Sequence, residues 1–138
     1  MENLETLIEN FAFLESWEDK YQYLIELGEQ LEPLPDNLKT DAFNVAGCQS
    51  EVWLVPSMQD QKFCFRADSD AIMVKGIISI LLAVYHQKNI TEIKNIEVEK
   101  IFDKLGLEEH LSPSRRNGMR SMVDKIRFYA AQFEKTME

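Results

Sequence analysis

The segment from residue 72 to residue 85 constrains the fold of this chain more than any other. Apolar side chains occupy most of the circumference of a helix drawn through it, and Ser79 alone interrupts the run from Ile77 to Tyr85. A helix that is apolar all round must be covered by other elements. The run is far shorter than the ~20 residues of a membrane span, and the acidic first residues resemble no signal or transit peptide. We therefore expect a central buried helix in a soluble, cytoplasmic protein.

A β-hairpin is expected immediately before this helix. Residues 52–55 are a β-type run that Pro56 is expected to end. Residues 62–68 alternate between apolar and other side chains, which is typical of a half-buried strand. Residues 58–61 would form the turn, and residues 44–46 offer a third short strand. Because a strand pair alone is marginally stable, helices must cover one face of it.

Helical periodicity predicts the rest of the chain. Apolar side chains recur at helical spacing in four further stretches: residues 3–14, residues 17–31, residues 91–105 and residues 112 onwards. Start and stop signals support these boundaries, with Ser16, the pair Ser112–Pro113, and Ser69 or Asp70 as helix starts and Gly106 as a stop. We therefore predict one α+β domain over residues 1–138, in which a small antiparallel sheet packs against helices.

The net charge excludes one class of function. The chain has 15 Lys and Arg against 24 Asp and Glu, a formal charge of −9. Residues 1–36 hold ten of the acids and a single base, Lys20, so the excess lies at the N-terminal end. A chain of this charge repels phosphate backbones, so we do not expect nucleic-acid binding as its main function.

The sequence Gly47-Cys48-Gln49-Ser50 contains the strongest candidate for chemistry. Cys48 follows a glycine and precedes a strand, so it is expected in a loop, where the glycine leaves access to the thiol. A loop thiol with small and polar neighbours can ionise and attack sulfur. The alternative is a small packed residue at the entry of a strand, and the local sequence leaves it open.

The second cysteine, Cys64, lies between Phe63 and Phe65 in the expected strand, so we predict a packed, inert residue. Pairing of the strands would allow a bridge from Cys48 to Cys64. Two cysteines in a chain of this kind nevertheless favour free thiols in a reducing cytoplasm.

No pattern in the sequence indicates a metal or a cofactor. It contains no Cys-x-x-Cys, no His-Glu-x-x-His and no glycine-rich phosphate loop. Asp68-Ser69-Asp70 resembles the beginning of a calcium loop, but residue 79 is Ser where such a loop requires a bidentate Glu. Helix capping explains these acids more simply.

Arg115, Arg116 and Arg120 cluster at the start of the last helix, where positive charge opposes the helix dipole. A neighbouring carboxylate could balance them, and so could an anion or an acidic partner surface. The sequence leaves both explanations open.

At these residues the chain resembles a known family. Gly47-Cys48-Gln49-Ser50 followed by Val52-Trp53 is similar to the sulfur-acceptor motif of the SufE family of cysteine desulfurase partners. Further blocks resemble the same family along nearly the whole chain: Trp17-Glu18 with Lys20-Tyr21 and Glu26-Leu27-Gly28, Asp68-Ser69-Asp70-Ala71 with Val74-Lys75-Gly76, and Leu111-Ser112-Pro113-Ser114-Arg115 with Gly118. Ala67 stands where relatives often have glycine, and Cys64 lies outside the motif.

The resemblance implies a fold like that of the IscU/NifU scaffold proteins and a function without a cofactor of its own. It implies that Cys48 accepts sulfane sulfur from a pyridoxal-phosphate cysteine desulfurase and stimulates that enzyme. The persulfide would then pass to an iron–sulfur scaffold complex or another sulfur acceptor. The SufE and CsdE branches of the family both fit.

The resemblance also implies a docking surface near Cys48, to which we assign Asp68, Asp70, Arg115 and Arg116. In the alternative, the acids cap a helix and the arginines pair with them internally. An iron–sulfur scaffold is a rival function, but a cluster requires about four cysteine-type ligands. A non-catalytic desulfurase adaptor is a second rival, against which the cysteine inside the motif argues. No nucleic-acid or membrane partner is expected, and a weak homodimer is left open.

Overall fold

The apolar segment forms the central helix of the molecule. In the computed structural model, which describes residues 3–137, helix α3 spans Ile72–Tyr85. Ten of its fourteen residues are buried, and Ile80 and Tyr85 are fully covered. The predicted central buried helix is therefore confirmed, and the other elements are arranged around it.

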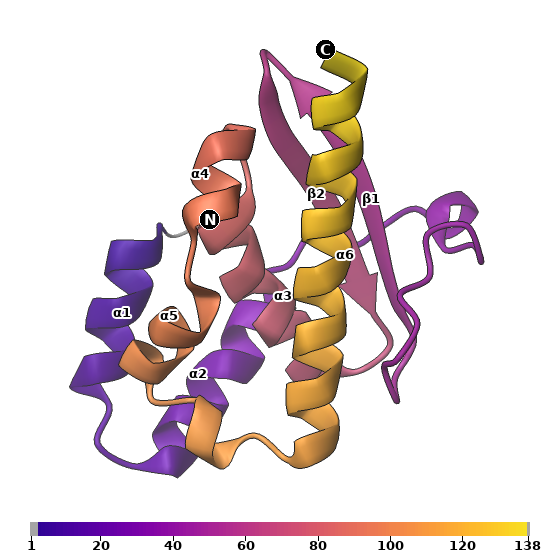
Figure 1. Cartoon of the computed structure of the whole chain (residues 1–138). Helices are drawn as coiled ribbons and strands as arrows, with labels where there is room; N and C mark the ends of the chain where they lie inside the picture. Colours follow the sequence, from indigo (N-terminus) through magenta and orange to yellow (C-terminus); the bar gives the residue numbers. More distant parts are fainter. Residues whose placement is uncertain (1–2, 138) are drawn as a thin grey trace.

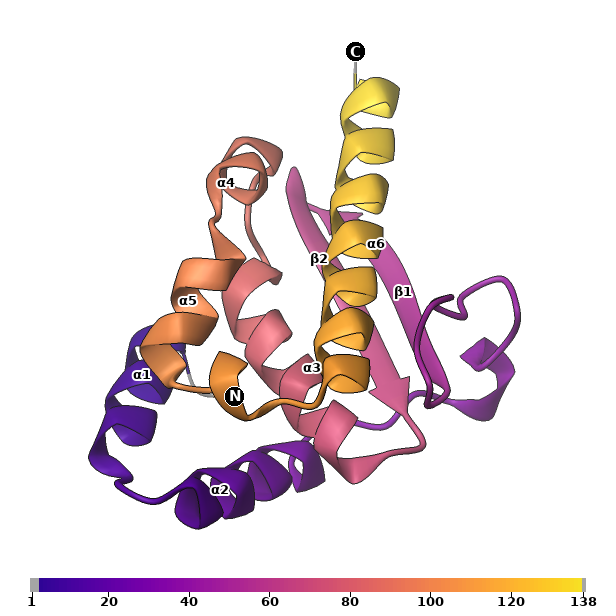
Figure 2. The ribbon, with the colours of Figure 1, turned by 60° about the horizontal axis from the view of Figure 1, so that its bottom comes forward.

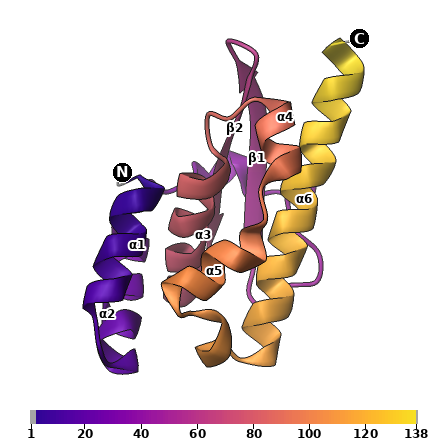
Figure 3. The ribbon, with the colours of Figure 1, turned by 60° about the vertical axis from the view of Figure 1, so that its left-hand side comes forward.

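The covering elements lie on two sides of α3. The hairpin of β1 (Val52–Gln59) and β2 (Lys62–Ser69) and the long helix α6 (Pro113–Met137) lie on one side, whereas α1 (Leu4–Phe13) and α2 (Trp17–Glu29) lie on the other (Figures 1 and 3). The short helices α4 (Ile90–Asn95) and α5 (Val98–Leu105) pack against α6 and α1, respectively. Two 3₁₀ turns, Asp36–Leu38 and Glu108–His110, complete the described elements. The predicted α+β class, with a two-stranded antiparallel sheet packed against helices, is confirmed.

Helices α2 and α3 approach each other closely at two glycines. Figure 2 shows α2 crossing the N-terminal half of α3. A Cβ atom on Gly28 would lie 2.7 Å from the carbonyl oxygen of Ile72, and one on Gly76 would collide with the carbonyl oxygen of Leu24. Close packing against α3 thus explains the glycine in the last turn of α2.

The expectation that Pro56 ends the first strand is wrong, because β1 continues to Gln59. The amide of Leu54 donates to the Phe43 carbonyl, on the side away from β2. Backbone groups two residues apart in a strand point the same way, so the nitrogen of Pro56 also faces the free edge. Its missing N–H therefore removes no bond to β2. The turn is correspondingly tighter than predicted, with Asp60 and Gln61 at positive φ angles of 52° and 65°.

Strand β2 is more deeply buried than its alternating sequence predicts. Only Lys62 and Arg66 are exposed, and Cys64 and Asp68 are buried together with the apolar positions. One face of β2 packs against α3, while the segment that precedes β1 covers Asp68 on the other face. Near residues 44–46 the predicted third strand is reduced to a single bridge between Asn44 and Trp53.

The start and stop signals are confirmed except at α3. Ser16 caps α2, Gly106 ends α5 in the left-handed conformation, and the Ser112 hydroxyl caps α6. Helix α3 instead begins after Ala71, whose side chain makes no capping bond. Ser69 and Asp70 do not cap the first turn of α3. The Ser69 hydroxyl donates to the Glu51 carbonyl and accepts from the amide of Ala71, which precedes the helix, and the Asp70 carboxylate accepts from the Glu51 amide. Within residues 3–137, no helix is both long and apolar enough to cross a membrane.

Candidate functional site

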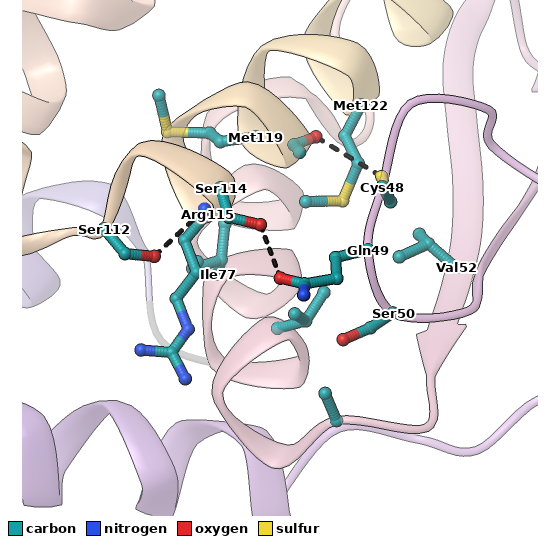
Figure 4. A pocket seen from close by; sticks show the side chains of 13 residues that line it. Cys48, Gln49, Ser50, Val52, Ile77, Ser112, Ser114, Arg115, Met119 and Met122 are labelled. Atoms are coloured by element: carbon teal, nitrogen blue, oxygen red, sulfur yellow. Dashed lines mark hydrogen bonds between the residues drawn. The ribbon is translucent and has the colours of Figure 1, made fainter.

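Cys48 lies in a loop that packs directly on helix α6. Gly47 has a φ of +88°, and a Cβ atom there would lie 2.6 Å from the Ser121 hydroxyl, so only glycine fits this position. The Gln49 side-chain oxygen accepts a hydrogen bond of 2.6 Å from Ser114. The Cys48 sulfur lies 3.6 Å from the carbonyl oxygen of Gly118, to which its thiol donates (Figure 4). Three contacts with one helix thus fix the position of the loop.

The Cys48 thiol lines a cavity of about 230 Å³ between this loop, α3 and α6. Its apolar wall consists of buried or half-buried side chains: Val52, Val74, Ile77, Met119 and Met122. Its polar rim consists of Gln49, Ser50, Ser112, Ser114 and Arg115. Figure 4 shows the sulfur directed toward the α6 wall. The cavity is large enough to hold more than the thiol itself and opens next to exposed polar groups.

The surroundings of Cys48 favour the neutral thiol. Burial raises the pKa of the Cys48 thiol above its ordinary value. The Gly118 carbonyl, an acceptor, also favours the protonated form. At neutral pH the neutral thiol therefore predominates at the resting site, and a change in these surroundings would raise the fraction of the reactive thiolate.

Arg115 reaches the rim of the cavity, but Arg116 does not. One Arg115 guanidinium nitrogen donates a 2.7 Å hydrogen bond to the Tyr21 hydroxyl, and the guanidinium carbon lies 5.9 Å from the centre of the Tyr21 ring. Arg116 is exposed and lines a different hollow together with Glu108 and other charged side chains. Consecutive helical residues point about 100° apart, which separates the two arginines.

The two predicted docking acids differ in exposure. The Asp68 side chain is 2% exposed and accepts hydrogen bonds from the backbone amides of Leu34 and Ser69. Lys39 and Lys75 lie 3.5 Å and 3.9 Å from its two oxygens. The expectation that Asp68 faces a partner is therefore not met, because the segment that precedes β1 covers its carboxylate. Asp70 is exposed, and its carboxylate accepts from the amide of Glu51.

Cys64 is buried in β2, as predicted, and both cysteines are free thiols. The Cys64 sulfur contacts the carbonyl oxygen of Lys62 and lines no part of the Cys48 cavity. Among residues 3–137, no three His, Cys, Asp or Glu side chains gather as metal ligands would.

Sequence reasoning missed the role of one face of α6. Ser114, Gly118 and Ser121 lie at spacings of four and three residues and together receive the Cys48 loop. That run of small residues at helical spacing was the available signal, since it marks a face on which another backbone lies close. The contact of Tyr21 with Arg115 was also missed, because the sequence shows Tyr21 only as a member of one block of the family resemblance.

The architecture has a counterpart among solved structures. The solution structure of a hypothetical protein from Thermus thermophilus superposes with a TM-score of 0.75 over 94% of this chain and 93% of that one. Its sequence is 19% identical, so this likeness shows a shared fold and nothing more. The class is thus a small α+β protein with one half-buried loop cysteine facing a cavity.

The sequence comparisons place the chain within that class. The family model for SufE, described as an Fe-S metabolism associated domain, matches residues 5–130. Uncharacterized SufE-like proteins of Rhizobium meliloti (strain 1021) and Rhizobium etli are each 44% identical over 131 residues. These alignments cover 92% of this chain and 94% and 88% of the two relatives. The chain belongs to the SufE family, so the resemblance found in its sequence is confirmed, with a role in iron–sulfur metabolism.

Proposed function

We propose that this chain is a sulfur carrier that accepts sulfane sulfur on Cys48 from a pyridoxal-phosphate cysteine desulfurase. The observation that carries the proposal is the placement of Cys48, a loop thiol at the edge of an apolar cavity with an open polar rim. Membership of a family associated with iron–sulfur metabolism supports it. The same exchange would stimulate the desulfurase, because it clears that enzyme's own persulfide.

The proposed reaction is a thiol exchange at sulfur. The Cys48 thiolate attacks the terminal sulfur of the desulfurase persulfide, forming a new sulfur–sulfur bond while the old one breaks. The desulfurase cysteine leaves as a thiolate, so the negative charge moves to the enzyme and no external oxidant or reductant is consumed. A second exchange of the same kind would pass the sulfur to an iron–sulfur scaffold complex or another acceptor thiol.

The cavity has a role in the interval between these exchanges. A persulfide on Cys48 would extend the side chain by one sulfur atom, for which the space beside Met119 and Met122 is available. Apolar walls would keep water and stray thiols away from it. Release would require the loop to leave the contacts with Gly118 and Ser114, which docking of the partner would provide. A reducing compartment such as the cytoplasm suits two free thiols.

Intact-mass measurement tests the proposal. The wild-type chain is incubated with a purified pyridoxal-phosphate cysteine desulfurase and cysteine, and the expected product has gained the mass of one sulfur atom, which a thiol reductant removes. Stimulated desulfurase turnover with no gain of mass would favour the adaptor alternative instead. A stoichiometric metal that disappears in Cys48→Ser would favour the scaffold alternative.

A further inference from the structure

Among the residues that the structure describes, Tyr21 is the side chain that holds the Arg115 guanidinium at the rim of the Cys48 cavity. The Tyr21 hydroxyl oxygen accepts a hydrogen bond from one Arg115 N–H group, and the guanidinium carbon lies 5.9 Å from the centre of the Tyr21 ring. None of the ion pairs among residues 3–137 includes Arg115. A guanidinium has five N–H donors, so most of this planar fork remains open beside the cavity. Figure 4 shows the group extending away from Cys48, toward α2.

Tyr21 is itself fixed by an aromatic stack. Its ring meets Trp17 edge to face at a centroid distance of 5.3 Å. Trp17 in turn stacks on His110, with centroids 4.4 Å apart and ring planes 18° apart. Because Trp17 and Tyr21 belong to α2 while His110 precedes α6, the stack joins the first half of the chain to the segment that carries Arg115. The Tyr21 hydroxyl therefore has a fixed position from which to orient the arginine.

We propose that Tyr21 is a positioning residue that presets Arg115 to bind a carboxylate of the docking desulfurase at the rim of the Cys48 cavity. This inference rests on the proposed function and adds the chemistry of the partner surface. A free arginine side chain loses much rotational freedom on binding, and prior orientation removes part of that cost. A carboxylate fits because its two oxygens match the open fork.

Affinity measurements on four proteins form the main test: wild type, Tyr21→Phe, Arg115→Ala and the double variant. Tyr21→Phe keeps the ring and its stacking and removes only the hydroxyl that orients Arg115. We expect it to weaken binding of a purified cysteine desulfurase by roughly tenfold, as for the loss of one hydrogen bond to a charged group. In the Arg115→Ala background the same change should have no further effect.

Two controls separate positioning from a general loss of structure. Tyr23→Phe, also on α2, removes a hydroxyl that is bonded to Asn10, so it should leave the affinity unchanged. Arg115→Lys keeps the charge and loses the fork, so it should bind almost as weakly as Arg115→Ala. The amount of sulfur that Cys48 gains should likewise be the same in wild type and Tyr23→Phe.

A measurement without the partner completes the test. The Arg115 side-chain N–H signals in NMR spectra should be sharp in wild type and broadened or averaged in Tyr21→Phe. Unchanged signals, or an equal loss of affinity with and without Arg115, would overturn the positioning role. Failure of the wild-type chain to gain sulfur would instead contradict the proposed function and leave the NMR result intact.

Discussion

The surroundings of Cys48 in the resting protein favour a protonated, weakly nucleophilic thiol. Burial raises the pKa of its thiol, and the Gly118 carbonyl accepts its proton in a hydrogen bond. Because a thiolate is required for attack on sulfur, the resting site keeps most molecules unreactive at neutral pH. In the proposed function, docking would bring two sulfurs together and would also move Cys48 out of the environment that favours its protonated form.

This state predicts the pH dependence of alkylation. In a Cys64→Ser background, where Cys48 is the sole thiol, the rate of iodoacetamide alkylation should rise with pH to a midpoint above the pKa of an ordinary cysteine. The raised pKa also means that the folded state resists ionisation, so this stabilising contribution is present below the unfolded pKa and declines as pH rises through the folded one. Alkylation in denaturant is the control and should titrate normally. An equal midpoint in both conditions would contradict the storage of a neutral thiol.

At the residue scale, the reactive thiol could be predicted from the sequence, but the side chains that surround it could not. Cys48 was predictable because a glycine and a following strand place it in a loop, and the motif around it is specific to a family. Arg115 and Arg116 looked equivalent as neighbours in the sequence. Only the direction of the cavity, which depends on how α6 lies against the Cys48 loop, shows that Arg115 alone reaches it.

At the scale of elements, two glycines in helices differ in whether their surroundings require glycine. Gly76 has no space for a side chain, because a Cβ atom would collide with the Leu24 carbonyl of α2. Gly118 lies beside Cys48, where a Cβ atom would be 3.6 Å from the sulfur, an ordinary contact. The first glycine is required by packing between rigid backbones, and the second is not.

Alanine substitutions test this difference. Gly76→Ala should lower the free energy of unfolding by roughly 1–3 kcal/mol, because overpacking outweighs the better helix propensity of alanine. Gly118→Ala should be neutral or stabilising by up to about 1 kcal/mol, since the propensity gain remains and no clash opposes it. Urea unfolding of both variants measures the two values. Equal losses in both would contradict the packing assigned to α2 and α3.

Element boundaries were predictable where the signal is local. Ser112 and Gly106 acted as predicted because capping involves residues within one turn. Pro56 was misjudged, because its effect depends on which side of β1 the partner strand occupies. Ser69 and Asp70 were misassigned as caps for a similar reason. Their side chains form hydrogen bonds with the backbone of Glu51, which is distant in sequence, and these bonds could not be predicted locally.

At the scale of the whole molecule, Asp68 joins β2 and the start of α3 to the segment around Leu34, which is 34 residues away in sequence. Its buried carboxylate accepts a hydrogen bond from the Leu34 amide. It also forms ion pairs with Lys39, which lies in the same segment as Leu34, and with Lys75 of α3. No local pattern predicts this arrangement, since an acid in a half-buried strand would ordinarily face water. The family block that contains Asp68 therefore includes a structural residue beside residues of the candidate site.

Amide substitutions of the two acids separate structure from docking. Asp68→Asn should lower the free energy of unfolding by roughly 2–4 kcal/mol, because buried donors and two lysines lose a charged acceptor. Asp70→Asn should cost less than about 1 kcal/mol, since Asp70 is exposed and an amide oxygen can still accept from Glu51. Thermal or urea unfolding supplies the comparison. A stable Asp68→Asn protein that fails to bind a desulfurase would return Asp68 to the docking surface.

The central claim is that Cys48, in its cavity beside α6, is the thiol that carries sulfur. Its most direct test is peptide-mapped mass spectrometry after incubation with a purified cysteine desulfurase and cysteine. The matched variants are Cys64→Ser and Cys48→Ser, each of which leaves one thiol. We predict that Cys64→Ser gains one sulfur atom on the peptide containing Cys48, and that Cys48→Ser remains folded and gains none. Added sulfur on Cys64, or on neither cysteine in an otherwise active mixture, would contradict the account.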